Sequence, residues 1–239
     1  MSKIRGEAPA GFTLKPTATK LTAGAATTFA FAIQDGMGVT VKDFADDQTK
    51  LMHFYLVRSD LTGFQHIHPT MGADGTWSAA VQALQAGSWR AYASFIAKDM
   101  SGKQVPLVLS TPVIVGSGAG TQPLPAAAST TQADGYTLTL GGDKMMANMT
   151  HALTVTITKD GKPVTDLQSY LATYAHLTAF HQGDMAFAHL HPQGEATGDH
   201  GGPSLTFQAM LGQGGPWRLF IQFQTAATLH TAAITVTVG

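Results

Sequence analysis

One histidine pattern occurs twice in the sequence. In each copy a histidine is followed thirteen positions later by a second histidine, then by one other residue, a third histidine and a proline. The members are His53, His66, His68 and Pro69 in the first copy and His176, His189, His191 and Pro192 in the second. A spacing repeated this closely indicates two copies of one structural unit.

The spacing of the second copy predicts a β-hairpin with its histidines on one face. Residues two apart in a strand point to the same side, which puts His189 beside His191. Gly183-Asp184 has the composition of a two-residue hairpin turn. That turn pairs Thr178 with His189 and His176 with His191, so the three imidazoles converge.

The first copy predicts the same arrangement around Asp60-Leu61, with Tyr55 opposite His66 and His53 opposite His68. Asp60-Leu61 is a poor two-residue turn, and we expect a longer loop that reaches Thr62-Gly63. A loop lengthened symmetrically keeps the histidines on their common face.

Three imidazoles on a rigid scaffold suit zinc, copper(II) or nickel, because these ions accept neutral nitrogen ligands. The alternative is that each histidine is a half-buried strand residue that is hydrogen-bonded to a neighbour. The repetition favours the metal, since a packing role is open to other residue types.

Composition excludes several classes of function. The chain has 239 residues, a formal net charge of -1 and no cysteine. This net charge does not indicate a surface that binds nucleic acid or an anionic membrane. Without cysteine, disulfides, thiolate zinc sites and cysteine nucleophiles are excluded, and no nucleophile motif or glycine-rich phosphate loop is present.

The first residues, Met1 to Glu7, carry positive charge with no apolar stretch behind them, and no run approaches the roughly eighteen apolar residues of a membrane span. We expect no membrane span. The low charge and the absence of cysteine favour a secreted, periplasmic or cell-surface protein whose signal peptide is absent from this chain, over a cytoplasmic one.

Short runs of alternating threonine and apolar residues, without helical periodicity, predict antiparallel β-sandwiches. The run Gly87 to Phe95 is replayed by Gly215 to Phe223, with tryptophan, arginine and phenylalanine in matching places. A second half of similar length can bury its own core. We therefore predict an all-β chain of two tandem antiparallel β-sandwich domains, 12–116 and 135–239, joined by a linker, 117–134.

The copies differ after the histidine pair. From His68 to Trp89 there are 21 positions, and from His191 to Trp217 there are 26. The longer segment adds the potential ligands Glu195, Asp199 and His200. His230 occupies the place of Leu107 in the first copy and would complete a four-histidine set, so we expect the second copy to be the better site.

Two other sets of residues carry alternative chemistry. Gly183, His189, His191, Glu195 and Gly202 fit the first motif of a cupin, in which two histidines and a glutamate hold a metal for oxygen chemistry. The second cupin motif is missing around His230. Met145, Met146, Met149 and His151 offer ligands to copper(I), although methionines in strands more often pack in a core.

Several stretches resemble a family of exported bacterial proteins that are often secreted or lipid-anchored. They are Gly161 to Leu167, Tyr170-Leu171, His176, Gly183-Asp184, His189-Leu190-His191-Pro192, Trp217 to Phe220 and His230 to Ala232, with Leu56 to Pro69 in the first half. The resemblance implies a role associated with heavy-metal or copper handling. In architecture it points to the immunoglobulin-like or cupredoxin-like sandwiches of periplasmic copper proteins. The chain departs from the family at 172–175, which is usually glycine-rich, and in lacking the export signal.

The sequence thus predicts a protein that is not an enzyme and that binds a divalent metal ion, copper(II) first and zinc second, for sequestration or delivery outside the cytoplasm. The main ligands would be His176, His189, His191 and His230; a weaker site would use His53, His66 and His68. Affinity should fall below about pH 6.5, since imidazoles bind only when neutral. The alternatives are a cupin-like enzyme using His189, His191 and Glu195, and a structural or adhesive sandwich pair without metal. A protein partner for metal transfer is not identified.

Overall fold

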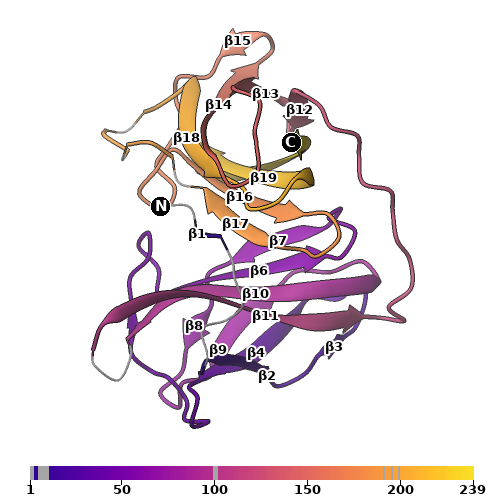
Figure 1. The fold of residues 1–239 in the computed structure, drawn as a ribbon, viewed down its shortest axis with the longest axis vertical. Helices are drawn as coiled ribbons and strands as arrows, with labels where there is room; N and C mark the ends of the chain where they lie inside the picture. Colours follow the sequence, from indigo (N-terminus) through magenta and orange to yellow (C-terminus); the bar gives the residue numbers. More distant parts are fainter. Residues whose placement is uncertain (1–2, 5–10, 99–101, 191, 195, 199) are drawn as a thin grey trace. The chain divides into compact units, whose positions relative to one another are not determined.

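The computed structural model describes residues 3–4, 11–98, 102–190, 192–194, 196–198 and 200–239. Every regular element in these residues is a β-strand, which confirms the predicted all-β class (Figure 1). No helix of membrane-spanning length and hydropathy occurs in the described ranges. The chain divides into two compact units, a first unit of residues 6–123 and a second unit of residues 124–239 together with 1–5.

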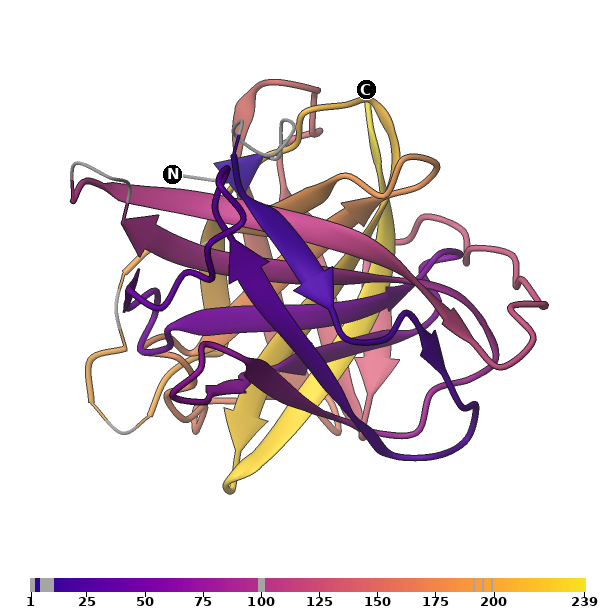
Figure 2. The ribbon, with the colours of Figure 1, turned by 90° about the horizontal axis from the view of Figure 1, so that it is seen from below.

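The first unit is a sandwich of two sheets. One sheet has the strand order β3-β11-β10-β6-β7, with β5 paired to β10, and the other has the order β2-β4-β9-β8. Figure 2 shows the indigo strands β2 and β4 crossing over the long magenta strands β10 and β11. The strands are β2 (Thr13–Pro16), β3 (Lys20–Leu21), β4 (Thr27–Gln34), β5 (Phe44–Ala45), β6 (Met52–Arg58), β7 (Phe64–Ile67), β8 (Thr70–Met71), β9 (Trp77–Val81), β10 (Gly87–Lys98) and β11 (Gln104–Val115).

The second unit repeats this plan. One sheet has the order β1-β17-β16-β19-β20, and the other has the order β12-β13-β14-β15, with β18 paired to β14. Its strands are β1 (Lys3–Ile4), β12 (Thr130–Ala133), β13 (Tyr136–Gly142), β14 (Thr150–Lys159), β15 (Lys162–Pro163), β16 (Ala175–His181), β17 (Phe187–Leu190), β18 (Ser204–Met210), β19 (Gly215–Thr225) and β20 (Thr228–Val238). Strand β12 lies within the segment 117–134 that we predicted as a linker.

Matching contacts confirm the internal repeat. The indole nitrogen of Trp89 donates to the carbonyl oxygen of Gln85 at 2.9 Å, and that of Trp217 donates to the carbonyl oxygen of Gln213 at 3.0 Å. Both tryptophans are buried and lie on the strand that pairs with the histidine hairpin. The same strand order and the same side-chain contact therefore recur in both units.

Strand β6 is buried at all of its positions, in contrast to the half-exposed strands of the opposite sheet. Phe54 and Leu56 point into the sandwich core, where the Phe54 ring lies 5.3 Å from Phe29 and 5.0 Å from Phe31 between centroids. His53 and Tyr55 point to the other face, because side chains alternate along a strand. Core packing on one face thus fixes the direction of the histidine on the other.

The hairpin loops differ from a two-residue turn, and the strand register is nevertheless as predicted. In the second unit the loop spans 182–185, with the amide of Met185 bonded to the carbonyl oxygen of His181 and Met185 at φ 57°. The predicted two-residue turn at Gly183-Asp184 is therefore wrong, because Met185 takes a left-handed conformation instead of pairing with Gln182. The longer loop predicted for the first unit is confirmed by the bond from Arg58 N to Gly63 O.

We predict that Phe54→Ala lowers the free energy of unfolding of the first unit by about 3–5 kcal/mol, because it removes a buried ring and leaves a cavity. Urea unfolding followed by tryptophan fluorescence measures the change. Val39→Ala serves as the control, since Val39 is 57% exposed and its truncation should leave the midpoint unchanged. Equal midpoints for the Phe54 variant and the wild type would contradict the assigned core.

Candidate metal centre

The candidate site of the first unit is built on the hairpin β6–β7. Tyr55 is paired with His66 and Phe54 with Ile67, as the sequence predicts. The same register, continued by one residue, brings His53 opposite His68, just beyond the end of β7. His53, His66 and His68 therefore share one face, and one ring nitrogen of each lies within 4.8 Å of the other two.

The separations suit a metal ion. Two nitrogens bound to a tetrahedral zinc at about 2.0–2.1 Å lie about 3.4 Å from each other. The Nδ1 of His53 and the Nε2 of His66 are 3.1 Å apart. The His68 ring lies 4.6 Å from His66 and 5.1 Å from His53 between centroids, nearly perpendicular to both.

His53 is oriented by the backbone. Its Nε2 lies 2.9 Å from the carbonyl oxygen of Asp47, in the tight turn that joins Asp47 to Lys50. A carbonyl oxygen only accepts, so Nε2 carries the proton and the neutral ring has its lone pair on Nδ1, which faces His66. In a metal-bound histidine, the ring nitrogen that does not bind the metal usually donates a hydrogen bond to an acceptor such as a backbone carbonyl.

His68 is held in its neutral form. Burial, followed by electrostatic interactions with His53 and Lys50, lowers the pKa of His68 from 6.5 to about 3. A ring with this pKa is uncharged at neutral pH, which is the state that binds a cation. Tyr55 stacks on His66 with 4.4 Å between ring centroids, which limits the tilt of that imidazole.

The second unit places His176 and His189 in the same relation. The Nδ1 of His176 and the Nε2 of His189 are 3.4 Å apart, and both side chains are buried. These are the same two nitrogens as in the first unit. The expected third ligand, His191, lies outside the described residues, as do Glu195 and Asp199. His200 is exposed, and it belongs to no cluster of three potential metal ligands among the described residues.

His230 does not join the histidines of the second unit. It is paired with Phe223 on β19, a core residue, whereas His176 is paired with Gln222, the next residue along. Side chains of adjacent strand residues point to opposite faces, so His230 lies on the core side of the sheet and His176 on the other. The prediction that His230 completes a four-histidine set is therefore wrong.

His230 belongs instead to a polar chain that the sequence analysis missed. Its Nδ1 lies 2.9 Å from Asp134 Oδ2, and its Nε2 lies 3.0 Å from the hydroxyl of Thr225. Asp134 is distant from His230 in sequence and was assigned to the linker. The sequence signal that could have identified Asp134 is the Ala133-Asp134-Gly135 turn, in which Asp134 has a positive φ of 50°.

The alternative sets are described only in part. Of the cupin set His189, His191 and Glu195, the structure describes His189 alone. In the methionine-rich segment the Nε2 of His151 accepts a hydrogen bond from the backbone amide of Met146 at 3.0 Å. That nitrogen is therefore occupied, and the segment is a poorer copper(I) site than the sequence suggests.

A cavity of about 310 Å³ adjoins the first histidine set. His68 is one of its lining residues, together with Lys50, Met52 and Met71, and Asp46 contributes a carboxylate. A metal ion held by three histidines has room for a fourth ligand, which water or a small anion supplies in comparable sites.

Comparisons with solved structures return tandem β-sandwich proteins at low similarity. The Escherichia coli adhesin FdeC is 16% identical with a TM-score of 0.30, and the match covers 98% of this chain and 66% of that one. The Yersinia pseudotuberculosis adhesin InvE is 13% identical with a TM-score of 0.27, covering 95% and 58%. The tandem Ig repeats of Dlar are 11% identical with a TM-score of 0.25, covering 97% and 99%. The chain thus spans about two thirds or less of the two adhesin structures.

No curated protein matches the sequence. The model of a domain of unknown function, DUF8832, matches residues 7–111 and 130–239, which include every candidate ligand of both units. The chain therefore belongs to the DUF8832 family.

Proposed function

We propose that the first unit binds a divalent transition metal ion, copper(II) first and zinc second, through His53, His66 and His68. The observation that carries the proposal is the convergence of one ring nitrogen from each histidine within 4.8 Å. The bond from His53 to Asp47 supports it, because this bond directs the Nδ1 lone pair of His53 toward His66. The lowered pKa of His68 supports it as well, because it keeps that ring neutral.

The donor set is the basis for the choice of metal. Three imidazoles without a thiolate or a carboxylate in the described cluster favour copper(II) and zinc over magnesium, calcium or manganese, which prefer oxygen ligands. Copper(II) exceeds zinc in intrinsic affinity for nitrogen ligands. Sequestration or delivery, without catalysis and outside the cytoplasm, remains the role that we propose for the bound ion.

The second unit is proposed as a second site of the same kind. His176 and His189 repeat the nitrogen separation of the first unit, and His191 is the third ligand expected from the sequence. His230 is no longer part of this proposal. The prediction that the second site is the stronger loses one of its two grounds with that fourth histidine. The other ground, the potential ligands of the longer segment, stays a prediction, because Glu195 and Asp199 lie outside the described residues.

A structural or adhesive role without metal is the second candidate. It is favoured by the fact that both nitrogens of His53 already have partners, Asp47 O and His66 Nε2. In that case the histidines serve only to satisfy one another on a buried face. The cupin-like enzyme is the weaker alternative, because the second cupin motif is missing around His230.

Metal stoichiometry tests the proposal. Wild type should bind copper(II) or zinc at up to two equivalents. His66→Ala should lower the metal affinity of the first site by more than about 100-fold, because losing a ligand costs more affinity than losing a residue that only hydrogen-bonds to a ligand. Isothermal titration calorimetry with elemental analysis after dialysis gives both numbers. His66 is half-buried, so its truncation is tolerable, and circular dichroism checks the fold.

His151→Gln is the matched control, since His151 lies outside both histidine sets and should leave the stoichiometry unchanged. His230→Ala should also retain metal. Wild-type protein that binds no metal would overturn the proposal and leave the structural reading. A loss of metal in Glu195→Ala, with His66→Ala unaffected, would favour the cupin-like enzyme.

The pH dependence of stability tests the state of His68. Its folded pKa, about 3, lies below the 6.5 of the unfolded chain, so the unfolded state takes up the proton first as the pH falls. The metal-free protein should therefore lose stability between pH 6.5 and about 3, with His68 contributing up to about 1.4 kcal/mol per pH unit. His68→Gln should make the decline shallower, measured by urea unfolding in EDTA at pH 7, 6, 5 and 4. Parallel curves for variant and wild type would show that His68 titrates normally.

A further inference from the structure

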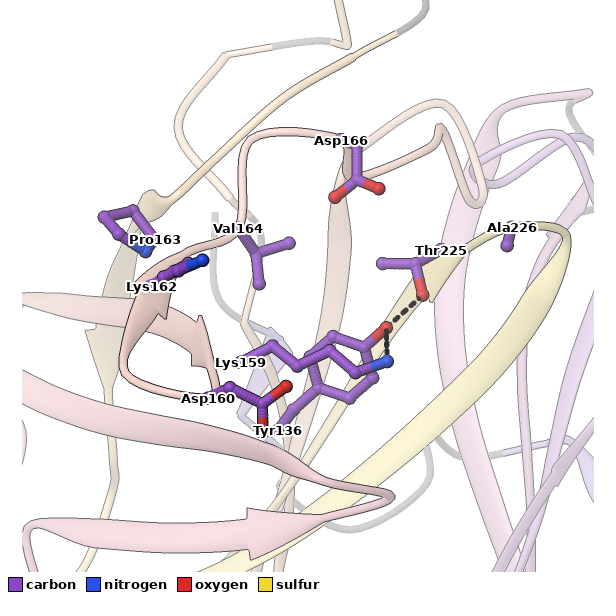
Figure 3. A pocket seen from close by; sticks show the side chains of 9 residues that line it. All are labelled: Tyr136, Lys159, Asp160, Lys162, Pro163, Val164, Asp166, Thr225 and Ala226. Carbon is purple, nitrogen blue, oxygen red and sulfur yellow. Dashed lines mark hydrogen bonds between the residues drawn. The ribbon is translucent and has the colours of Figure 1, made fainter.

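The second unit contains a charged cavity that is separate from the histidine sets. Its volume is about 360 Å³, at the small end of the range for ligand pockets. Figure 3 shows it between the β14–β15 hairpin and the end of β19. Its lining residues are Tyr136, Lys159, Asp160, Lys162, Pro163, Val164, Asp166, Thr225 and Ala226.

A chain of hydrogen bonds supports one wall. The carboxylate of Asp134 only accepts, so His230 donates to it from Nδ1 at 2.9 Å. The Nε2 of His230 is hydrogen-bonded to the hydroxyl of Thr225, which is hydrogen-bonded in turn to the hydroxyl of Tyr136 at 2.7 Å. The Tyr136 oxygen accepts from Lys159 Nζ at 3.4 Å, so the chain ends at the Lys159 ammonium.

This chain positions an otherwise mobile lysine. Lys159 is exposed, but its ammonium lies 4.6 Å from the centroid of the Tyr136 ring as well as against the hydroxyl. Tyr136 and Thr225 are 6% and 4% exposed, so the platform under the lysine is rigid. The ammonium has two further N–H groups that are not used in this contact.

A second lysine is forced next to the first. Lys162 is directly opposite Lys159 in the β14–β15 register, across the turn formed by Asp160 and Gly161. Like charges placed directly opposite on paired strands are destabilising. By Coulomb's law, an anion held between two ammonium groups would offset their repulsion. No ion pair within the described ranges joins either lysine to a carboxylate.

Carboxylates face the same cavity. Asp166 lies on the wall across from the lysines in Figure 3, and Asp160 lies beside them. Two ammonium groups and two carboxylates give this lining no net charge, which disfavours a polyanion such as a phosphate ester. A ligand that carries one carboxylate and one ammonium group complements both walls.

We propose that this cavity binds a small zwitterion of the α-amino-acid class. The ligand carboxylate accepts hydrogen bonds from Lys159 and Lys162, and the ligand ammonium donates to Asp166. Tyr136 acts as a positioning residue, because it orients Lys159. The proposal does not depend on metal binding, since none of these residues belongs to the histidine sets.

Titration calorimetry in EDTA, with L-alanine and a panel of other α-amino acids as probes, tests the proposal. We expect saturable binding to wild type and a loss of about tenfold or more in affinity for Lys162→Gln and for Asp166→Asn, since each removes a charge-assisted hydrogen bond. Lys144→Gln is the control, because Lys144 is exposed and is not among the lining residues. Tyr136→Phe keeps the ring and removes the hydroxyl. It should weaken binding while the protein stays folded, which its melting temperature checks.

Two half-ligands and a neutral sugar complete the test. Acetate lacks the ammonium group, ethylamine lacks the carboxylate and glucose lacks both, so each should bind at least about tenfold more weakly than L-alanine. Acetate that binds as well as L-alanine would reduce the site to an anion site, and tight binding of glucose would replace the class by a saccharide. No saturable binding of any amino acid would overturn the proposal, and Asp166→Asn without effect would overturn the assigned orientation.

Discussion

The register of the two hairpins is the constraint on which the candidate metal centre depends. In β6–β7 the core residues Phe54 and Leu56 alternate with His53 and Tyr55. A slip of one residue would turn the histidines into the core and the phenylalanine out of it. The free energy of core packing therefore also fixes the three imidazoles on one face, and the metal geometry needs no separate stabilisation.

The histidine face of each hairpin is buried, and this burial has a free-energy cost. His53 and His189 are fully buried, and buried polar groups are costly unless they have partners. In the first unit the partners of His53 are a backbone carbonyl and a neighbouring imidazole. A metal ion would replace the imidazole contact and keep the carbonyl contact. The apoprotein and the metal-bound protein can thus share one backbone arrangement, which favours binding with little reorganisation.

The alternation of side chains along a β-strand explains what could be predicted from the sequence. The pairs Tyr55–His66 and Thr178–His189 followed from spacing alone, because a symmetric change in loop length leaves cross-strand partners unchanged. The loop at 182–185 was not predictable, since it depends on Met185 adopting a left-handed conformation. His230 was misplaced because its face depends on the register of β20 against β19, which no histidine spacing encodes. Its contact with Asp134 joins positions 96 residues apart.

The loops show how a duplicated hairpin acquires different supports. In the first unit Arg58 pairs with Asp60 and donates to the carbonyl oxygens of Ala86 and Gly120. Burial alone would raise the pKa of Asp60, but hydrogen bonds from Thr62 and the amide of Gln122, with the charge of Arg58, hold it below its usual value. That loop is therefore fixed by charges that persist across neutral pH.

In the second unit the position of Arg58 is taken by His181, which bonds to Asp184 at 2.7 Å and to the carbonyl oxygen of Gly214 at 3.1 Å. An imidazole thus takes the place of a permanently charged guanidinium in the support of this hairpin. The same fold thus holds two histidine faces on loops of different electrostatic character. The register, which the core enforces, is the same in both units, whereas the loops that join the paired strands differ.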